Sequence, residues 1–371
     1  TDLVNHIRRI LDESDSPPTL AIVFADPDHD LADANTLLNE RGVAFVGATT
    51  SGAAADGVLS VGASSAILID LPRDAFRMFA SHQDETIADA TVRLGAEAVA
   101  HFAEPVLLIF SAGLREGGDA VLTYIAQGAK RTLPVFGGIA GADFNLQQNS
   151  VFASGVRLEE GLVAVVLDGK RVALDTVASS GWEPVGIELE VTSSEGTLVK
   201  EINGQPVLDV YRSYMVVDDV ETTMSTTDAG VGRYVGAHHP LSVRFGGAPP
   251  VMRTPAFIDT DSGGIVFSGD IPKGALVRFC MPPSFDVVER VVASGKALRE
   301  RASDADAVLI VSCKARHTSL GPYAEDEIRA LSSLWDAPQI GFFSYGEFGT
   351  ELASDQGFHN STCMLIALRV L

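Results

Sequence analysis

Two segments in opposite halves of this chain repeat one pattern, and that repeat limits the folds open to it. VLLIFSAGLR (106–115) aligns without gaps to AVLIVSCKAR (307–316), which places Ser111 over Ser312. Each segment is followed by a helical pattern and then by a strand that begins with proline. Unbroken apolar runs of this length are typical of strands covered on both faces. The repeat therefore predicts two related domains, each with a mixed β-sheet flanked by helices.

The order of the expected elements indicates the fold class. Apolar runs of strand length alternate with helical periodicity in the first part of the chain, and short strands separated by turn residues follow. We expect strands at 19–26, 43–52, 105–113 and 134–141, and helices at 30–41 and 84–100. This order predicts a mixed α/β protein with α+β character rather than a purely doubly wound one.

The stretch SGWEPVG (180–186) marks the expected domain boundary, because Gly181 and Pro184 interrupt regular structure. The predicted domains are therefore residues 1–180 and 181–371. If the two halves pack together, the cleft between them is a natural pocket, and we expect their polar strand ends to meet there.

Composition argues against several classes of protein. With 46% hydrophobic and 20% charged residues, the 371-residue chain can build packed cores. Its net charge of −22 argues against nucleic-acid and anionic-membrane partners, which need a basic surface. No apolar run reaches transmembrane length, and residues 1–15 lack the apolar core of a signal peptide. Cys280, Cys313 and Cys363 form no C-x-x-C pair, so we expect a reducing, cytoplasmic location.

Groups able to hydrogen-bond or ion-pair are concentrated between residues 313 and 362, which we interpret as the ligand face. Arg316 and Glu347 are the charged candidates in this stretch, and Tyr345 and Asn360 are the polar ones. Arginine recognises a carboxylate with two parallel hydrogen bonds, and a carboxylate holds an ammonium group. The two charged residues could therefore hold the ends of an amino acid, or form a structural ion pair with each other.

The glycine-rich segment GGIAGAD (137–143) follows an expected strand in the first half. Gly137 and Gly138 would let the backbone approach a ligand closely. The segment is not a G-x-G-x-x-G fingerprint, and no P-loop lysine follows it, so it does not indicate a nucleotide site. It is either a binding loop or a tight turn that Asp143 caps.

Cys313 is a candidate nucleophile, because Lys314 and Arg316 beside it would lower its pKa. A buried structural cysteine at a strand end is the alternative. The second half offers histidines for metal or haem ligation, although no metal-binding motif supports this. These histidines are His238, His239, His317 and His359.

An ordered set of motifs resembles the FIST N domain followed by the FIST C domain, over roughly residues 18–370. GATTSG, FGGIAGAD and SGWEPVG resemble the first domain, and INGQPVLDVY, HHPL, SCKAR, GFFSYGEFG and FHNST resemble the second. Ala48 departs from the pattern, because the family often has cysteine at that position.

The resemblance implies an intracellular sensory module that binds a small ligand, with amino acids proposed, and signals through a separate kinase or cyclic-dinucleotide enzyme. One branch of the family resembles haem-binding nitric-oxide sensors. Carried over by motif, the positions of interest are Cys313, Arg316, Tyr345, Glu347, Asn360, Gly137, Gly138 and Asp143. We therefore expect a non-catalytic small-molecule sensor. The alternatives are a haem-based gas sensor, an enzyme that uses Cys313, and a structural protein without a pocket.

Overall fold

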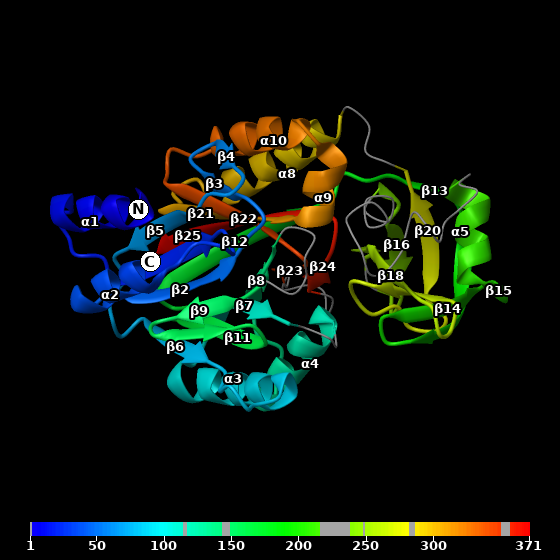
Figure 1. Ribbon diagram of the computed structural model, residues 1–371, viewed down its shortest axis with the longest axis horizontal. Helices are drawn as coiled ribbons and strands as arrows, with labels where there is room; N and C mark the ends of the chain where they lie inside the picture. Colours follow the sequence, from blue (N-terminus) through cyan, green and yellow to red (C-terminus); the bar gives the residue numbers. More distant parts are fainter. Residues whose placement is uncertain are drawn as a thin grey trace.

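The repeat seen in the sequence occurs in three copies among the residues that the structure describes. The computed structural model describes residues 2–113, 117–142, 149–215, 238–247, 249–281, 286–349 and 357–371. Figure 1 shows a larger lobe, which holds both chain ends, and a smaller lobe beside it. The three copies build the larger lobe, and the described residues between 184 and 281 build the smaller one.

Each copy, called a unit below, contains a helix, two parallel strands joined by helical structure, a hairpin and a returning strand. The first unit comprises α1 (Asp2–Glu13), β1 (Leu20–Ala25), α2 (Ala32–Glu40), β2 (Ala44–Thr49), β3 (Ala53–Ala55), β4 (Val58–Ser60), β5 (Ser65–Ile69) and β6 (Phe76–Ala80). The second comprises α3 (Ile87–His101), β7 (Pro105–Ala112), α4 (Gly118–Ala129), β8 (Val135–Ile139), β9 (Val151–Ala153), β10 (Val156–Leu158), β11 (Gly161–Asp168) and β12 (Val172–Ser179). The third comprises α8 (Val287–Arg301), β21 (Ala307–Cys313), α9 (Lys314–Leu320), α10 (Tyr323–Ser332), β22 (Gln339–Ser344), β23 (Glu347–Gly349), β24 (Phe358–His359) and β25 (Cys363–Val370).

The three sheets share one strand order, and each takes its hairpin from another unit. The parallel pairs are β1 with β2, β7 with β8 and β21 with β22, and the antiparallel returning strands are β5, β11 and β25. The hairpin β9–β10 joins β2, β23–β24 joins β8, and β3–β4 joins β22. This cyclic exchange ties the three units into one body, because none of these sheets is complete without strands from another unit.

Side chains on alternate faces of the central strands explain the layers of the larger lobe. In β1, Ile22 and Phe24 face the core between the three sheets, whereas Ala21 and Val23 pack under α1 and α2. Aromatic rings from all three units meet in that core: Phe24, Phe110 and Phe342. Phe24 stacks on Phe342, with ring centroids 4.3 Å apart. The helices of the other two units cover the outer faces of their own sheets in the same way.

The described part of the smaller lobe is an antiparallel sheet with a helix packed on it. It comprises β13 (Pro184–Glu195), β14 (Leu198–Ile202), β15 (Gln205–Pro206), α5 (Val207–Met215), β16 (Leu241–Arg244), β17 (Val251–Arg253), β18 (Pro255–Asp259), β19 (Gly264–Phe267) and β20 (Leu276–Cys280). Its separate core includes Tyr211 of α5 and Phe279 of β20, whose ring centroids are 4.7 Å apart.

These observations confirm the expected mixed α/β class. The strands expected at 19–26, 43–52, 105–113 and 134–141 correspond to β1, β2, β7 and β8, and the helices at 30–41 and 84–100 correspond to α2 and α3. The division into residues 1–180 and 181–371 stays a prediction. In space, β12 from the first half pairs along its whole length with β25 from the second. Among the described residues, no helix is both long enough and apolar enough to cross a bilayer.

Candidate functional site

Two pockets lie along the contact between the lobes, which we call the seam. The first, the α4 pocket, has a volume of about 750 Å³. The second, the strand-end pocket, has a volume of about 570 Å³. Both are lined by residues of both lobes, and both volumes are in the range of small-molecule sites.

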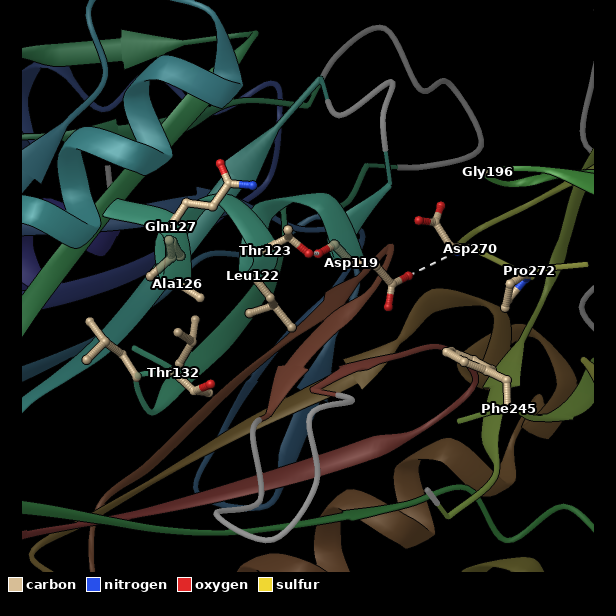
Figure 2. A pocket seen from close by; sticks show the side chains of 13 residues that line it. Asp119, Leu122, Thr123, Ala126, Gln127, Thr132, Gly196, Phe245, Asp270 and Pro272 are labelled. Atoms are coloured by element: carbon tan, nitrogen blue, oxygen red, sulfur yellow. Dashed lines mark hydrogen bonds between the residues drawn. The ribbon is translucent and has the colours of Figure 1, made fainter. Parts of the chain in front are cut away.

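The α4 pocket is largely apolar, with a few polar groups at one end. Figure 2 shows Leu122, Thr123 and Ala126 of α4 on one side, and Phe245, Asp270 and Pro272 of the smaller lobe on the other. The sequence explains the helix face, because α4 packs Val121 and Ile125 against its own lobe and leaves Leu122, Thr123 and Ala126 on the side of the pocket. The carboxyl groups of Asp119 and Asp270 lie at the polar end.

The strand-end pocket lies where parallel strands end, the usual ligand position in sheets of this kind. Gly113 directly follows β7, and Ile139 is the last residue of β8. Phe257 and Phe267 of the smaller lobe form an apolar wall. Tyr345, a predicted site residue, also lines this pocket.

Arg253 of β17 fastens the two lobes together at the seam. Its side chain is fully buried, and its Nη2 donates to both carboxylate oxygens of Asp119 in α4, at 2.9 and 3.0 Å. Its Nη1 donates to the carbonyls of Met252 and Phe358, and its Nε donates to the carbonyl of Asp270. All five N–H groups of the guanidinium are thus used, which is what burial of such a group requires.

The predicted residue Arg316 lies inside the larger lobe and lines neither seam pocket. Its Nε donates to Oε1 of Glu327 at 3.0 Å, and its Nη2 donates to Oε2 of the same carboxylate. Its Nη1 donates to the carbonyl of Ser180. An ion pair between Arg316 and Glu347 was one alternative from the sequence, but the ion-pair partner of Arg316 in the structure is Glu327. This placement favours a structural role for the guanidinium.

Glu347 is also fully buried, in a hydrogen-bonded cluster at the ends of β21 and β22. Ser344 Oγ donates to its Oε1 at 2.6 Å, and Thr362 Oγ1 donates to its Oε2 at 2.7 Å. Burial raises the pKa of Glu347 to about 8, although these hydrogen bonds and one from Cys313 favour the ionised form. Glu347 pairs with Gly138 of β8, so the structure brings these two predicted residues together.

The expectation that Lys314 and Arg316 lower the pKa of Cys313 is wrong. Burial and the nearby Glu347 raise the pKa of the Cys313 thiol far above its usual value, because both disfavour the thiolate. Cys280, Cys313 and Cys363 are all free and buried. A thiol in this setting stays protonated at neutral pH, and the geometry does not favour Cys313 as a nucleophile.

The remaining predicted residues have separate surroundings. Asn360 is fully buried, and neither atom of its amide group has a hydrogen-bond partner among the described residues. Gly137 and Gly138 lie within β8, where their backbone pairs with β7 and β23 rather than approaching a ligand. Asp143 lies outside the described residues.

The four candidate histidines have different surroundings. His359 is partly buried, its Nε2 is 3.2 Å from the carbonyl oxygen of Gly349, and burial lowers its pKa to about 4. His317 stacks on Phe343, with ring centroids 4.1 Å apart. Burial also lowers the pKa values of His238 and His239. None of the four lines a seam pocket, and within the described part of the chain no three potential ligands cluster around a metal position. The haem alternative, which needs only one of these imidazoles as a ligand, stays a prediction.

Three residues of the seam were missed by the sequence analysis, namely Asp119, Arg253 and Asp270. Arg253 had a usable signal, because a single arginine inside the apolar strand pattern VMRTPAFI must find a partner. The two aspartates had no such signal. Asp119 follows Gly118 at an expected helix start, and Asp270 follows Gly269 in an expected turn.

Comparison with known proteins finds two family domains along the chain. A family model described as the FIST N domain matches residues 19–205, and one described as the FIST C domain matches residues 208–350. An uncharacterized protein of Mycobacterium bovis is 25% identical over 237 residues, which cover 62% of this chain and 59% of that protein. An uncharacterized protein of Mycobacterium tuberculosis is 25% identical over 241 residues, covering 62% and 60%. The chain thus spans about three fifths of the length of these curated relatives.

Proposed function

The chain belongs to the FIST family, whose domains are sensory domains of signal transduction, and on that premise we propose that it binds a small molecule at the seam between its lobes. The observation that carries this proposal is the position of the two pockets. Each takes wall residues from both lobes, so a bound molecule would contact both at once. Such a ligand changes the relative stability of lobe arrangements, because it binds best to the one in which both walls are in place.

The signal would then leave the protein through a separate partner. Ligand binding could be coupled to the contact between the lobes, since Arg253 of β17 binds Asp119 in the first turn of α4, beside the α4 pocket. A ligand that shifts Asp119 would also shift the contact that holds the lobes. A signalling kinase or a cyclic-dinucleotide enzyme is the proposed partner, an amino acid is one candidate ligand, and a cytoplasmic location is part of the same proposal.

Among the predicted residues, Tyr345 is the one we retain as a direct ligand contact, because it lines the strand-end pocket. Cys313, Arg316, Glu347 and Asn360 would support the strand ends beneath the seam. Gly137 and Gly138 would do so through the backbone of β8.

A thermal-shift screen against a library of metabolites tests the proposal. A ligand present at one hundred times its dissociation constant stabilises the protein by about 2.7 kcal/mol, which is easily detected. The decisive variant is Ala126→Phe, which places a ring in the α4 pocket. We expect it to abolish the shift caused by a ligand of that pocket, with the unliganded melting temperature little changed.

The matched control is Ala96→Phe, which adds the same ring at an exposed position of α3. It should keep the shift. Ligands that stabilise both variants equally bind elsewhere, and a screen that yields only such ligands would remove the α4 pocket from the proposal.

A further inference from the structure

Two carboxylates, those of Asp119 and Asp270, line the α4 pocket, but the nearby guanidinium of Arg253 pairs only with Asp119. Arg253 provides one positive charge, and its two Nη2 hydrogen bonds go to the carboxylate of Asp119. Asp119 also accepts a hydrogen bond from the backbone N–H of Asp270, at 3.0 Å, the contact drawn in Figure 2. Arg253 reaches Asp270 only through its carbonyl oxygen. The guanidinium therefore has no N–H left for the Asp270 carboxylate.

The Asp270 carboxylate has no ion pair or hydrogen bond within the described part of the chain. It is half-buried, and it lies close to the backbone of Gly117 and Gly196, since a Cβ built on either would be 3.5 or 3.8 Å from its Oδ1. Lys273, three residues further on, is exposed and forms no ion pair with it. The positive end of α4, which starts next to Gly117, offsets only part of the charge. Burial and the Asp119 carboxylate raise the pKa of Asp270 by more than the nearby Arg253 guanidinium lowers it.

The rest of the pocket wall contains no positively charged side chain among the described residues. It consists of apolar groups from α4, β8 and the smaller lobe, together with hydroxyl and amide groups: Leu122, Thr123, Ile125, Ala126, Gln127, Thr132, Leu133, Val135, Phe245 and Pro272. A ligand carboxylate would find no cation here and would face two carboxylates. A ligand amine would find an unpaired carboxylate beside an apolar surface.

We propose that the α4 pocket binds small amines that carry an apolar group, with the ammonium of the ligand on the carboxylate of Asp270, and that it discriminates against zwitterionic amino acids. This inference rests on the proposed function and narrows its ligand class. A charge-assisted hydrogen bond in a partly buried site should favour the amine by about tenfold or more, because the charge of the Asp270 carboxylate is compensated when the amine binds.

Three probes with the same aromatic group test this preference: phenethylamine, 2-phenylethanol and phenylalanine. They present an ammonium, a neutral hydroxyl and a zwitterion, respectively. By titration calorimetry at neutral pH, we expect phenethylamine to bind about tenfold or more tightly than either of the others. As the pH falls through the pKa of Asp270, affinity for the amine should fall while affinity for the alcohol stays constant.

The variant Asp270→Asn should remove the advantage of the amine and leave the affinity for 2-phenylethanol within about twofold. Asp261→Asn is the matched control, because it removes the same charge from an exposed position of the same lobe. Unchanged amine affinity in folded Asp270→Asn protein would overturn the inference. If Asp270→Asn does not fold, the pH dependence in the native sequence decides.

The two proposals can fail separately. If the three probes bind equally well and Ala126→Phe abolishes their binding, the seam is a ligand site and the inference about amines is wrong. If neither the probes nor any library compound shows binding that Ala126→Phe removes, the α4 pocket fails as a ligand site, and the inference fails with it.

Discussion

Arg316 is a buried cation whose charge is neutralised within the larger lobe. Its partner Glu327 has only 2% of its side chain exposed. Replacing Arg316 by leucine would leave that carboxylate buried and unpaired, which typically destabilises a protein by about 3–5 kcal/mol. Urea unfolding should show this loss. The double variant Arg316→Leu with Glu327→Leu should recover most of it, and a single variant as stable as the native protein would contradict the structural role.

Glu347 makes stability depend on pH. Its pKa is about 8 in the folded protein and about 4.5 in the unfolded chain. Between these values the folded state keeps a proton that the unfolded state has lost, so the free energy of unfolding falls as the pH rises. The slope from this group approaches about 1.4 kcal/mol per pH unit.

The variant Glu347→Gln cannot titrate and should lose that slope. Urea unfolding measured from pH 5 to pH 8 compares the two proteins. Their difference in stability should change steadily across this range. Parallel curves would mean that the carboxyl group titrates with an ordinary pKa.

Close backbone approach, rather than ligand access, explains the glycines of β8. A Cβ at Gly137 would lie 1.9 Å from the carbonyl oxygen of Ile109 in β7, and its φ of 128° is unfavourable for other residues. We expect Gly137→Ala to separate β7 from β8 and to prevent folding or lower the melting temperature sharply.

The control Gly155→Ala has a φ of 80° but open space around the new methyl group. It carries backbone strain alone, about 1–2 kcal/mol. Circular dichroism melts separate the two effects. If both variants lose the same stability, packing against β7 is not the reason for glycine at position 137.

The arrangement of the lobes depends on Arg253. The chain crosses between the lobes near residues 180–184 and again between β20 and α8, and Arg253 adds a fully buried link at the seam. Arg253→Met should loosen this contact and speed amide hydrogen exchange in the first turn of α4 by about tenfold or more. Arg244→Met is the control, because the pair of Arg244 with Glu188 is exposed and contributes little. Equal rates of amide hydrogen exchange in the two variants would show that Arg253 does not hold the lobes together.

Much of the fold could be predicted from local patterns. The apolar runs gave β1, β2, β7 and β8, and the echo between 106–115 and 307–316 identified two of the three units. The first unit was missed because its strand LAIVFA has Ala25 where the others have Ser111 and Ser312. The candidate site was predicted less well, because the partner of a charged side chain depends on distances that spacing along the chain does not contain.

The sequence by itself determined where strands and helices form, the mixed α/β class and membership of the family, because periodicity, turn residues and ordered motifs are local properties. Only the tertiary structure decided that each hairpin joins the sheet of another unit, since backbone hydrogen bonds do not distinguish one strand from another. It also decided that Glu327, and not Glu347, neutralises Arg316, and that Asp270 is left unpaired beside a pocket. These outcomes depend on which groups come within hydrogen-bond distance, and packing sets that distance.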